Sequence, residues 1–202
     1  MVTPGAGRRS IGRGHVPAPR SAGGTGTTSP LAPFLPWSAA FAFGGPIGTM
    51  PLHASCAAFR GDGVLFLGPP GAGKSDLVLR LIGRGWTLVA DDQVELAAAG
   101  PDTLLATPPA ALRGLLEVRG LGLVRDLPIA APVPLRLVVD LLPPGEAPPR
   151  LPEPAAFEAQ GIRLPRLALA AREAAAPDKV ILALDAACGR LRLLAGAIPA
   201  AA

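Results

Sequence analysis

The segment at residues 68–75 has the residue types and the spacing of a phosphate-binding loop. It reads Gly68, Pro69, Pro70, Gly71, Ala72, Gly73, Lys74 and Ser75. Glycines let several backbone N–H groups converge on an anion at the start of a helix, whose dipole also favours phosphate. Lys74 would place a positive charge on the β- and γ-phosphates, and Ser75 would offer a hydroxyl to Mg²⁺. The loop therefore predicts binding of a nucleoside triphosphate and activation of its terminal phosphoryl group.

Two adjacent carboxylates, Asp91 and Asp92, follow the next apolar stretch of the chain. One carboxylate at such a place can hold a metal directly or through water, and a second can accept a proton from an attacking hydroxyl. An ordinary acidic turn is the alternative, because aspartate is common in turns. The pair is interpreted as functional because it should share a sheet edge with the glycine-rich loop.

The elements around these residues predict that shared edge. Residues 64–67 form an apolar run typical of a strand buried on both faces, and a helix is expected from Lys74 onward, since apolar residues recur there at helical spacing. Residues 86–90 form a second strand candidate. Strand, helix and strand make a right-handed βαβ unit whose strands end at one edge. Further strands are expected near residues 117–118, 135–142, 180–184 and 191–194, with a proline-rich connection at 143–154 and a turn region at 158–166.

Composition divides the chain in two. All four basic residues before position 50 are arginines and that stretch has no acidic residue, so it accounts for the formal net charge of +4. The high isoelectric point therefore describes this tail and does not indicate a partner that is nucleic acid. We expect residues 1–49 to be a disordered low-complexity tail and residues 50–202 to be one catalytic domain. A targeting segment, or a natural start at Met50, is the alternative explanation of the tail.

No apolar stretch is long enough to span a bilayer, and the two cysteines, Cys56 and Cys188, do not indicate a disulfide framework. The expected location is cytoplasmic. His53 and Glu117, taken alone, are ordinary polar residues. Their interpretation depends on a family resemblance.

His53, the loop at 68–75, and the segments at 89–95 (VADDQVE) and 116–122 (LEVRGLG) together resemble HPr kinase/phosphorylase in order and spacing. The resemblance implies an α/β, P-loop-containing nucleotide-binding domain with the HPr kinase/phosphoenolpyruvate carboxykinase-like fold. It also implies an ATP- and Mg²⁺-dependent kinase that phosphorylates a serine of the phosphocarrier protein HPr, and a homo-oligomer, in this family a hexamer. The reverse reaction, phosphorolysis of phosphoserine-HPr to give pyrophosphate, is the family's second activity.

The resemblance also assigns roles to residues. His53 and Lys74 match catalytic positions, and Ser75 and Glu117 match metal ligands. Asp92 matches the residue that accepts the proton in phosphorylation and donates it in the reverse direction, with Asp91 as its orienting or metal-side neighbour.

Later in the chain, Arg150 is similar to a further catalytic arginine. Leu164, Pro165 and Arg166 resemble a shortened remnant of the segment for phosphorolysis, whose fuller Pro-x-Arg-Pro-Gly-Arg-Asn sequence is absent. The kinase reaction is therefore the main expectation.

Two other functions are compatible with the loop. A small-molecule kinase would need an arginine-rich lid over its acceptor, and residues 145–172 contain Arg150, Arg163, Arg166 and Arg172. A non-catalytic ATP-sensing module would need only the loop and the metal, so the retained Asp92, Glu117 and His53 argue against it.

Overall fold

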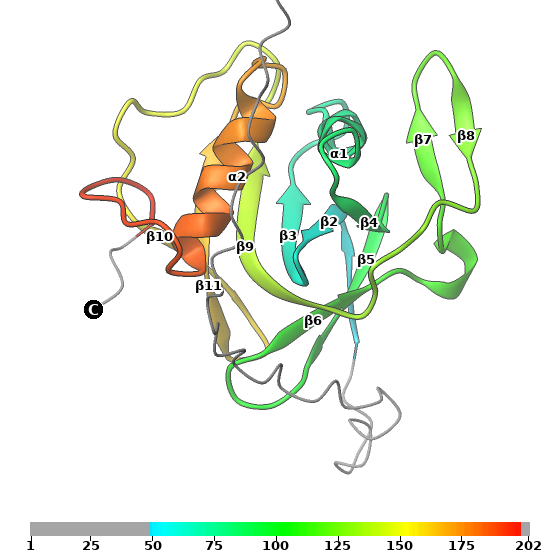
Figure 1. Ribbon diagram of the computed structural model, residues 1–202, viewed down its shortest axis with the longest axis horizontal. Coiled ribbons are helices and arrows are strands. Elements are labelled where there is room, and N and C mark those ends of the chain that lie inside the picture. The colour runs from blue at the N-terminus through cyan, green and yellow to red at the C-terminus, as the bar shows by residue number, and fades with distance from the viewer. Residues whose placement is uncertain (1–48, 199–202) are drawn as a thin grey trace, which may run out of the picture. The chain divides into compact units, whose positions relative to one another are not determined.

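The computed structural model describes residues 49–198 of the 202-residue chain (Figure 1). The tail expected at residues 1–49 thus lies outside the described residues, except for its last position. The helices are α1 (Lys74–Ile82), α2 (Ala176–Ala187) and a short 3-10 helix (Ala110–Leu112). The strands are β1 (Met50–His53), β2 (Ser55–Phe59), β3 (Asp62–Leu67), β4 (Thr87–Ala90), β5 (Gln93–Ala98), β6 (Leu104–Thr107), β7 (Leu116–Val118), β8 (Gly122–Val124), β9 (Val133–Leu141), β10 (Ala155–Ala159) and β11 (Ile162–Leu169).

Nine of these strands form one mixed sheet in the order β1-β5-β6-β9-β3-β2-β4, to which β11 and β10 are attached through β9. β9 is parallel to β3 on one side and to β11 on the other. β7 and β8 form a separate hairpin, which Figure 1 shows standing beside α1. The predicted α/β fold is thus confirmed as a mixed α/β domain.

The predicted βαβ unit is present, with one strand inserted. β2 lies between β3 and β4 and pairs antiparallel with each, so β3 and β4 run parallel to one another without being hydrogen-bonded neighbours. Because β3, β4, β9 and β11 all run in the same direction, their carboxyl ends share one edge of the sheet. The expectation of a common edge for the loop and the aspartates is therefore confirmed.

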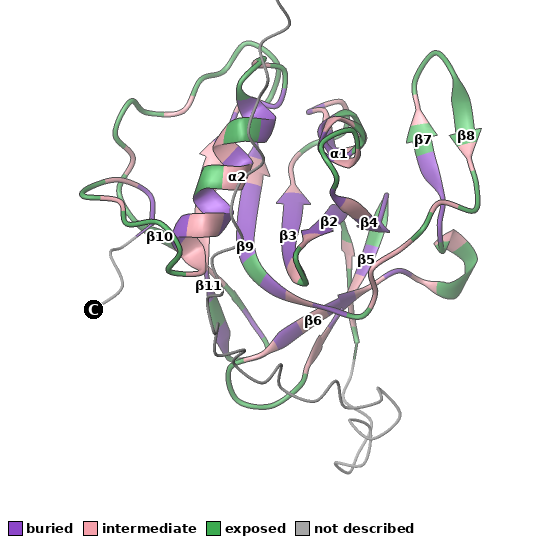
Figure 2. Ribbon diagram, viewed as in Figure 1, coloured by how far each residue is buried: buried purple, intermediate pink, exposed green. Residues whose placement is uncertain are grey.

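Buried residues are concentrated on the central strands (Figure 2), and they form two apolar clusters on opposite faces of the sheet. Val64 and Phe66 of β3 pack with α1 and α2 in one apolar cluster, whereas Leu65 belongs to a second cluster on the opposite face. All three side chains are fully buried, which is why this stretch reads as a continuous apolar run. Burial on both faces fixes the strand from which the glycine-rich loop starts.

Two predicted strands are wrong. Residues 180–184 lie in α2, where Val180, Ala183 and Leu184 face the core while Leu182 is exposed. That burial follows a helical period, and Pro177 in the first turn suits a helix start. Residues 191–194 form no strand. The turn region expected at 158–166 is instead the hairpin of β10 and β11, whose tip has positive φ at Gln160 and Gly161.

Candidate active site

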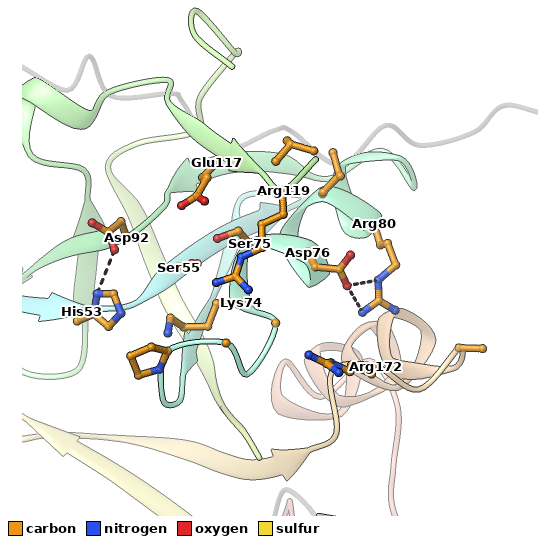
Figure 3. Close-up of a pocket in the computed structure, with 16 residues that line it drawn as sticks. His53, Ser55, Lys74, Ser75, Asp76, Arg80, Asp92, Glu117, Arg119 and Arg172 are labelled. Carbon is orange, nitrogen blue, oxygen red and sulfur yellow. Dashed lines mark hydrogen bonds and ion pairs between the residues drawn. The ribbon is translucent and has the colours of Figure 1, made fainter. Parts of the chain in front are cut away.

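A pocket of about 820 Å³ opens at the edge where the parallel strands end. It is lined by the glycine-rich loop, the first turns of α1, the ends of β1 and β7, the turn after β4 and the loop before α2. Figure 3 shows the polar side chains of these elements around one space. The volume is that of a typical small-molecule site.

The glycine-rich loop depends on conformations that glycine alone adopts easily. Gly68 has φ of 142°, and a Cβ there would lie 2.5 Å from the carbonyl oxygen of Leu141. Gly73 precedes α1 with φ of 101°, and its Cβ would lie 3.0 Å from Ala171. The backbone therefore approaches its neighbours too closely for a side chain. This close approach positions the start of α1 at the pocket.

Lys74, the first residue of α1, is nearly buried at 8% exposure. Its Nζ donates hydrogen bonds to the carbonyl oxygens of Gly68 at 2.9 Å and Pro69 at 3.3 Å. Burial lowers the pKa of Lys74 from its ordinary value, and the charges of Asp91 and Asp92 oppose that shift. The ammonium group is thus held in the loop, close to where the loop's N–H groups would receive an anion.

Asp91 and Asp92 occupy the two-residue turn between β4 and β5, and their side chains diverge. Asp91 is 5% exposed and accepts hydrogen bonds on both oxygens. Its Oδ1 accepts from Ser75 Oγ at 2.9 Å and from Ser55 Oγ at 2.5 Å, and its Oδ2 accepts from the backbone N–H of Glu117 at 3.3 Å. Because both of its oxygens already accept hydrogen bonds, Asp91 is suited to orienting its neighbours and poorly suited to accepting a proton from a substrate.

Asp92 lines the pocket and is exposed. It takes a left-handed conformation with φ of 69°, which aspartate tolerates better than most residues. Its Oδ1 lies 3.1 Å from Nδ1 of His53, because β1 pairs antiparallel with β5 and sets His53 opposite Gln93. Of the two adjacent aspartates, Asp92 is therefore the one that a substrate hydroxyl could reach.

Ser75 and Glu117 both line the pocket, and Glu117 is exposed. Ser75 donates its proton to Asp91, which leaves the oxygen lone pairs for a cation. Within residues 49–198 no group of three or more His, Cys, Asp or Glu side chains could hold a metal. Hard oxygen donors in small number suit Mg²⁺, which usually keeps several waters and binds substrate phosphates. The residues present fit this ion.

Two other predicted residues lie outside the pocket. Arg150 is exposed in the connection before β10 and does not line the pocket. Arg166 forms an ion pair with Asp140 across β11 and β9 and does not line it either. The pocket therefore gives no support to the catalytic role predicted for Arg150. It gives none either to the role in phosphorolysis suggested for Leu164, Pro165 and Arg166.

The pocket also contains residues to which the sequence assigned no catalytic role. Ser55, Arg119 and Arg172 line it, and Arg172 entered only as one arginine of a possible lid. Arg172 follows β11, so the rule that parallel strands end at one edge would have identified it, had that strand been predicted. Arg119 lies within the segment at 116–122. Ser55 gave no signal in the sequence.

Comparisons with known proteins point to the family that the motifs resemble. Residues 48–127 match the family described as HPr Serine kinase C-terminal domain. The HPr kinase/phosphorylase of Nitrosomonas europaea is 56% identical over 64 residues, 32% of this chain and 20% of that protein. The one from Cupriavidus metallidurans is 42% identical over 97 residues, 45% of this chain and 30% of that protein. The chain thus matches less than a third of the length of these relatives.

Among solved structures, the HPr(Ser) kinase/phosphatase from Coxiella burnetii superimposes with a TM-score of 0.57 at 26% identity, over 67% of this chain and 87% of that one. The resemblance predicted from the motifs is therefore confirmed: residues 48–127 are similar to the HPr kinase C-terminal domain, and the chain is similar in sequence and in structure to HPr kinase/phosphorylases.

Proposed function

We propose that this chain is an ATP-dependent phosphotransferase that phosphorylates a serine of the phosphocarrier protein HPr. The observation that carries the proposal is the exposed carboxylate of Asp92 in the same pocket as the phosphate-binding loop, beside His53. A protein that only binds ATP has no need of an available base there. Residues 50–202 would form the catalytic domain.

Binding of the triphosphate falls to the loop. The N–H groups at the start of α1 would receive phosphate oxygens, and Lys74 would leave the carbonyl oxygens of Gly68 and Pro69 to meet the β- and γ-phosphates. Burial lowers the pKa of Lys74, which means that the charged ammonium group is disfavoured in the empty loop. A bound phosphate would stabilise that charge, so Lys74 should prefer phosphate to the two carbonyl oxygens.

Ser75 and Glu117, which both line the pocket, would hold Mg²⁺ there, next to Asp91. When bound, Mg²⁺ neutralises charge on the β- and γ-phosphates and helps align them for transfer. Asp91 contributes by holding the Ser75 hydroxyl in place.

Asp92 would act as the base. As the serine oxygen of HPr bonds to the γ-phosphorus, the bond from that phosphorus to the β,γ-bridging oxygen breaks and ADP leaves. The serine proton passes to Asp92, which His53 keeps oriented from the side of β1. Most of the rate enhancement would come from alignment and charge, as is usual in phosphoryl transfer.

The reverse reaction is supported by one observation. Arg119 and Arg172 line the pocket, and neither has an ion-pair partner among residues 49–198. Guanidinium groups bind phosphate well, so a free phosphate could attack phosphoserine here while Asp92 returns the proton to serine. The products would be HPr and pyrophosphate.

The family resemblance further suggests a homo-oligomer, a hexamer in this family, and a cytoplasmic location. Among the described helices none is long and apolar enough to cross a bilayer. Light scattering after size-exclusion chromatography would measure the assembly.

The test of the proposal is label transfer. Purified chain incubated with Mg²⁺, γ-labelled ATP and the HPr of its own organism should label one serine of HPr. Adding phosphate to purified phosphoserine-HPr and assaying pyrophosphate tests the reverse reaction separately. Full ATP binding without any transfer would reject the kinase and favour an ATP sensor.

A further inference from the structure

Ser55 is a buried polar residue that none of the roles above uses. It begins β2, two positions after His53, and its side chain is fully buried at the floor of the pocket. Its Oγ donates to Oδ1 of Asp91 at 2.5 Å, the shortest side-chain contact of Asp91. A buried hydroxyl needs a partner, but this partner is itself bound to Ser75.

The side chain of Asp91 forms hydrogen bonds with three different elements. Ser55 belongs to β2, Ser75 to the first turn of α1, and the Glu117 N–H to β7. Ser55 and Ser75 donate to the same oxygen, while Glu117 donates to the other. Ser55 therefore fixes the oxygen that Ser75 uses, and the Glu117 bond prevents the carboxylate from turning about its axis.

This geometry determines where the lone pairs of Ser75 point. A serine hydroxyl can rotate freely, and its proton follows the best acceptor. With Asp91 fixed, the Ser75 proton is turned toward Asp91, and its lone pairs are left for a cation in the pocket that Glu117 also lines. Without Ser55, Asp91 would keep one bond fewer and could rotate or turn toward a cation itself.

We infer that Ser55 is a positioning residue for the cation of this site, acting through Asp91 on Ser75. The inference rests on the proposed function, because it concerns Mg²⁺ bound together with a nucleotide. It predicts that Ser55 affects the response to Mg²⁺ and leaves metal-free nucleotide binding alone.

The experiment measures binding of a fluorescent N-methylanthraniloyl derivative of ATP, first in EDTA and then over a Mg²⁺ titration. In Ser55→Ala the Mg²⁺ concentration for half-maximal effect should rise at least about fivefold, since a hydrogen bond to a charged group is lost from the network. Binding in EDTA should stay within about twofold, because the loop and Lys74 are untouched. Ser55→Cys, with a similar shape and a weaker donor, should lie between.

Cys56→Ala is the matched control. Cys56 is the next residue of β2, is equally buried, and packs in the cluster on the opposite face of the sheet. Its substitution should cost some stability and leave the Mg²⁺ response unchanged. A comparable shift in Cys56→Ala would mean that any damage to β2 has this effect, which would overturn the inference.

Repeating the Ser55→Ala substitution in an Asp91→Ala variant shows whether Ser55 acts through Asp91 or acts on the cation directly. If Ser55 acts through Asp91, Ser55→Ala should have no further effect there, whereas independent effects would add. An unchanged Mg²⁺ response in Ser55→Ala and Ser55→Cys, with a normal wild-type response, would reject the role of Ser55 alone. A wild-type chain whose nucleotide binding ignores Mg²⁺ would instead reject the proposed function.

Discussion

The Nδ1 atom of His53 lies 3.1 Å from Oδ1 of Asp92, although the two residues are far apart in the sequence. The antiparallel pairing of β1 with β5 creates this contact. Both side chains are more than half exposed, at 54% and 65%, so the contact is well solvated and should contribute little to folding. We expect its value to lie in orienting Asp92 for the acceptor hydroxyl.

Substitution of His53 tests whether its contact with Asp92 orients that carboxylate. His53→Ala should lower kcat for HPr phosphorylation by about 10- to 100-fold, because Asp92 stays as the base but loses the partner that orients it, and change unfolding stability by less than about 0.5 kcal/mol. His53→Asn is the control, because its amide nitrogen can occupy the place of Nδ1 and should restore part of kcat. Steady-state kinetics and urea unfolding provide the two readouts. Wild-type kcat in His53→Ala would contradict an orienting role.

The pKa of Lys74 predicts how nucleotide binding depends on pH. Only the ammonium form attracts phosphate, and burial lowers its pKa although Asp91 and Asp92 oppose the shift. As pH rises, Lys74 should therefore lose its proton, and with it affinity for ATP, at a lower pH than an ordinary lysine would. A titration of ATP affinity from neutral to alkaline pH measures this.

The other lysine of the described residues supplies the comparison. Lys179→Met should keep the wild-type pH profile, because Lys179 lies in α2 beside Glu173 and does not line the pocket. Lys74→Met should bind ATP weakly at every pH and lose the alkaline step. An alkaline step that persists in Lys74→Met would assign it to another group.

Gly68 and Gly71 give a prediction about stability. Both have positive φ, but a Cβ at Gly68 would lie 2.5 Å from a backbone oxygen, whereas one at Gly71 meets nothing within 4 Å. Gly68→Ala should therefore lose about 3 kcal/mol through strain and overpacking together, and Gly71→Ala about 1 kcal/mol through strain alone. Urea unfolding measures both values. Equal losses would show that the approach to Leu141 does not constrain the loop.

The sequence was sufficient to predict the part of the fold that binds phosphate. The run at residues 64–67, the glycine-rich loop and the periodic residues of α1 each carry a local signal, and all three are present as expected. The strand expected at residues 180–184 failed because a short apolar run has no clear period of its own. Its helical character depends on the core that Val180 and Leu184 face.

The candidate site, too, contains residues that the sequence predicted and residues that it did not. The residues in short motifs were brought together as expected at one pocket, and their roles remain predictions. Ser55 and Arg172 were missed because neither β2 nor β11 was predicted as a strand: β2 lies between β3 and β4, and β11 pairs with β9, a strand that comes well before it in the sequence. Long-range pairing of this kind leaves no local pattern.

The most direct test of the central claim compares wild type with Asp92→Asn in transfer of label from γ-labelled ATP to HPr. Asn has nearly the shape of Asp but cannot accept the serine proton. Wild type should label one serine, and Asp92→Asn should bind ATP within a few fold of wild type but transfer label at least about 100-fold more slowly. Transfer at the wild-type rate by Asp92→Asn would show that Asp92 is not the base.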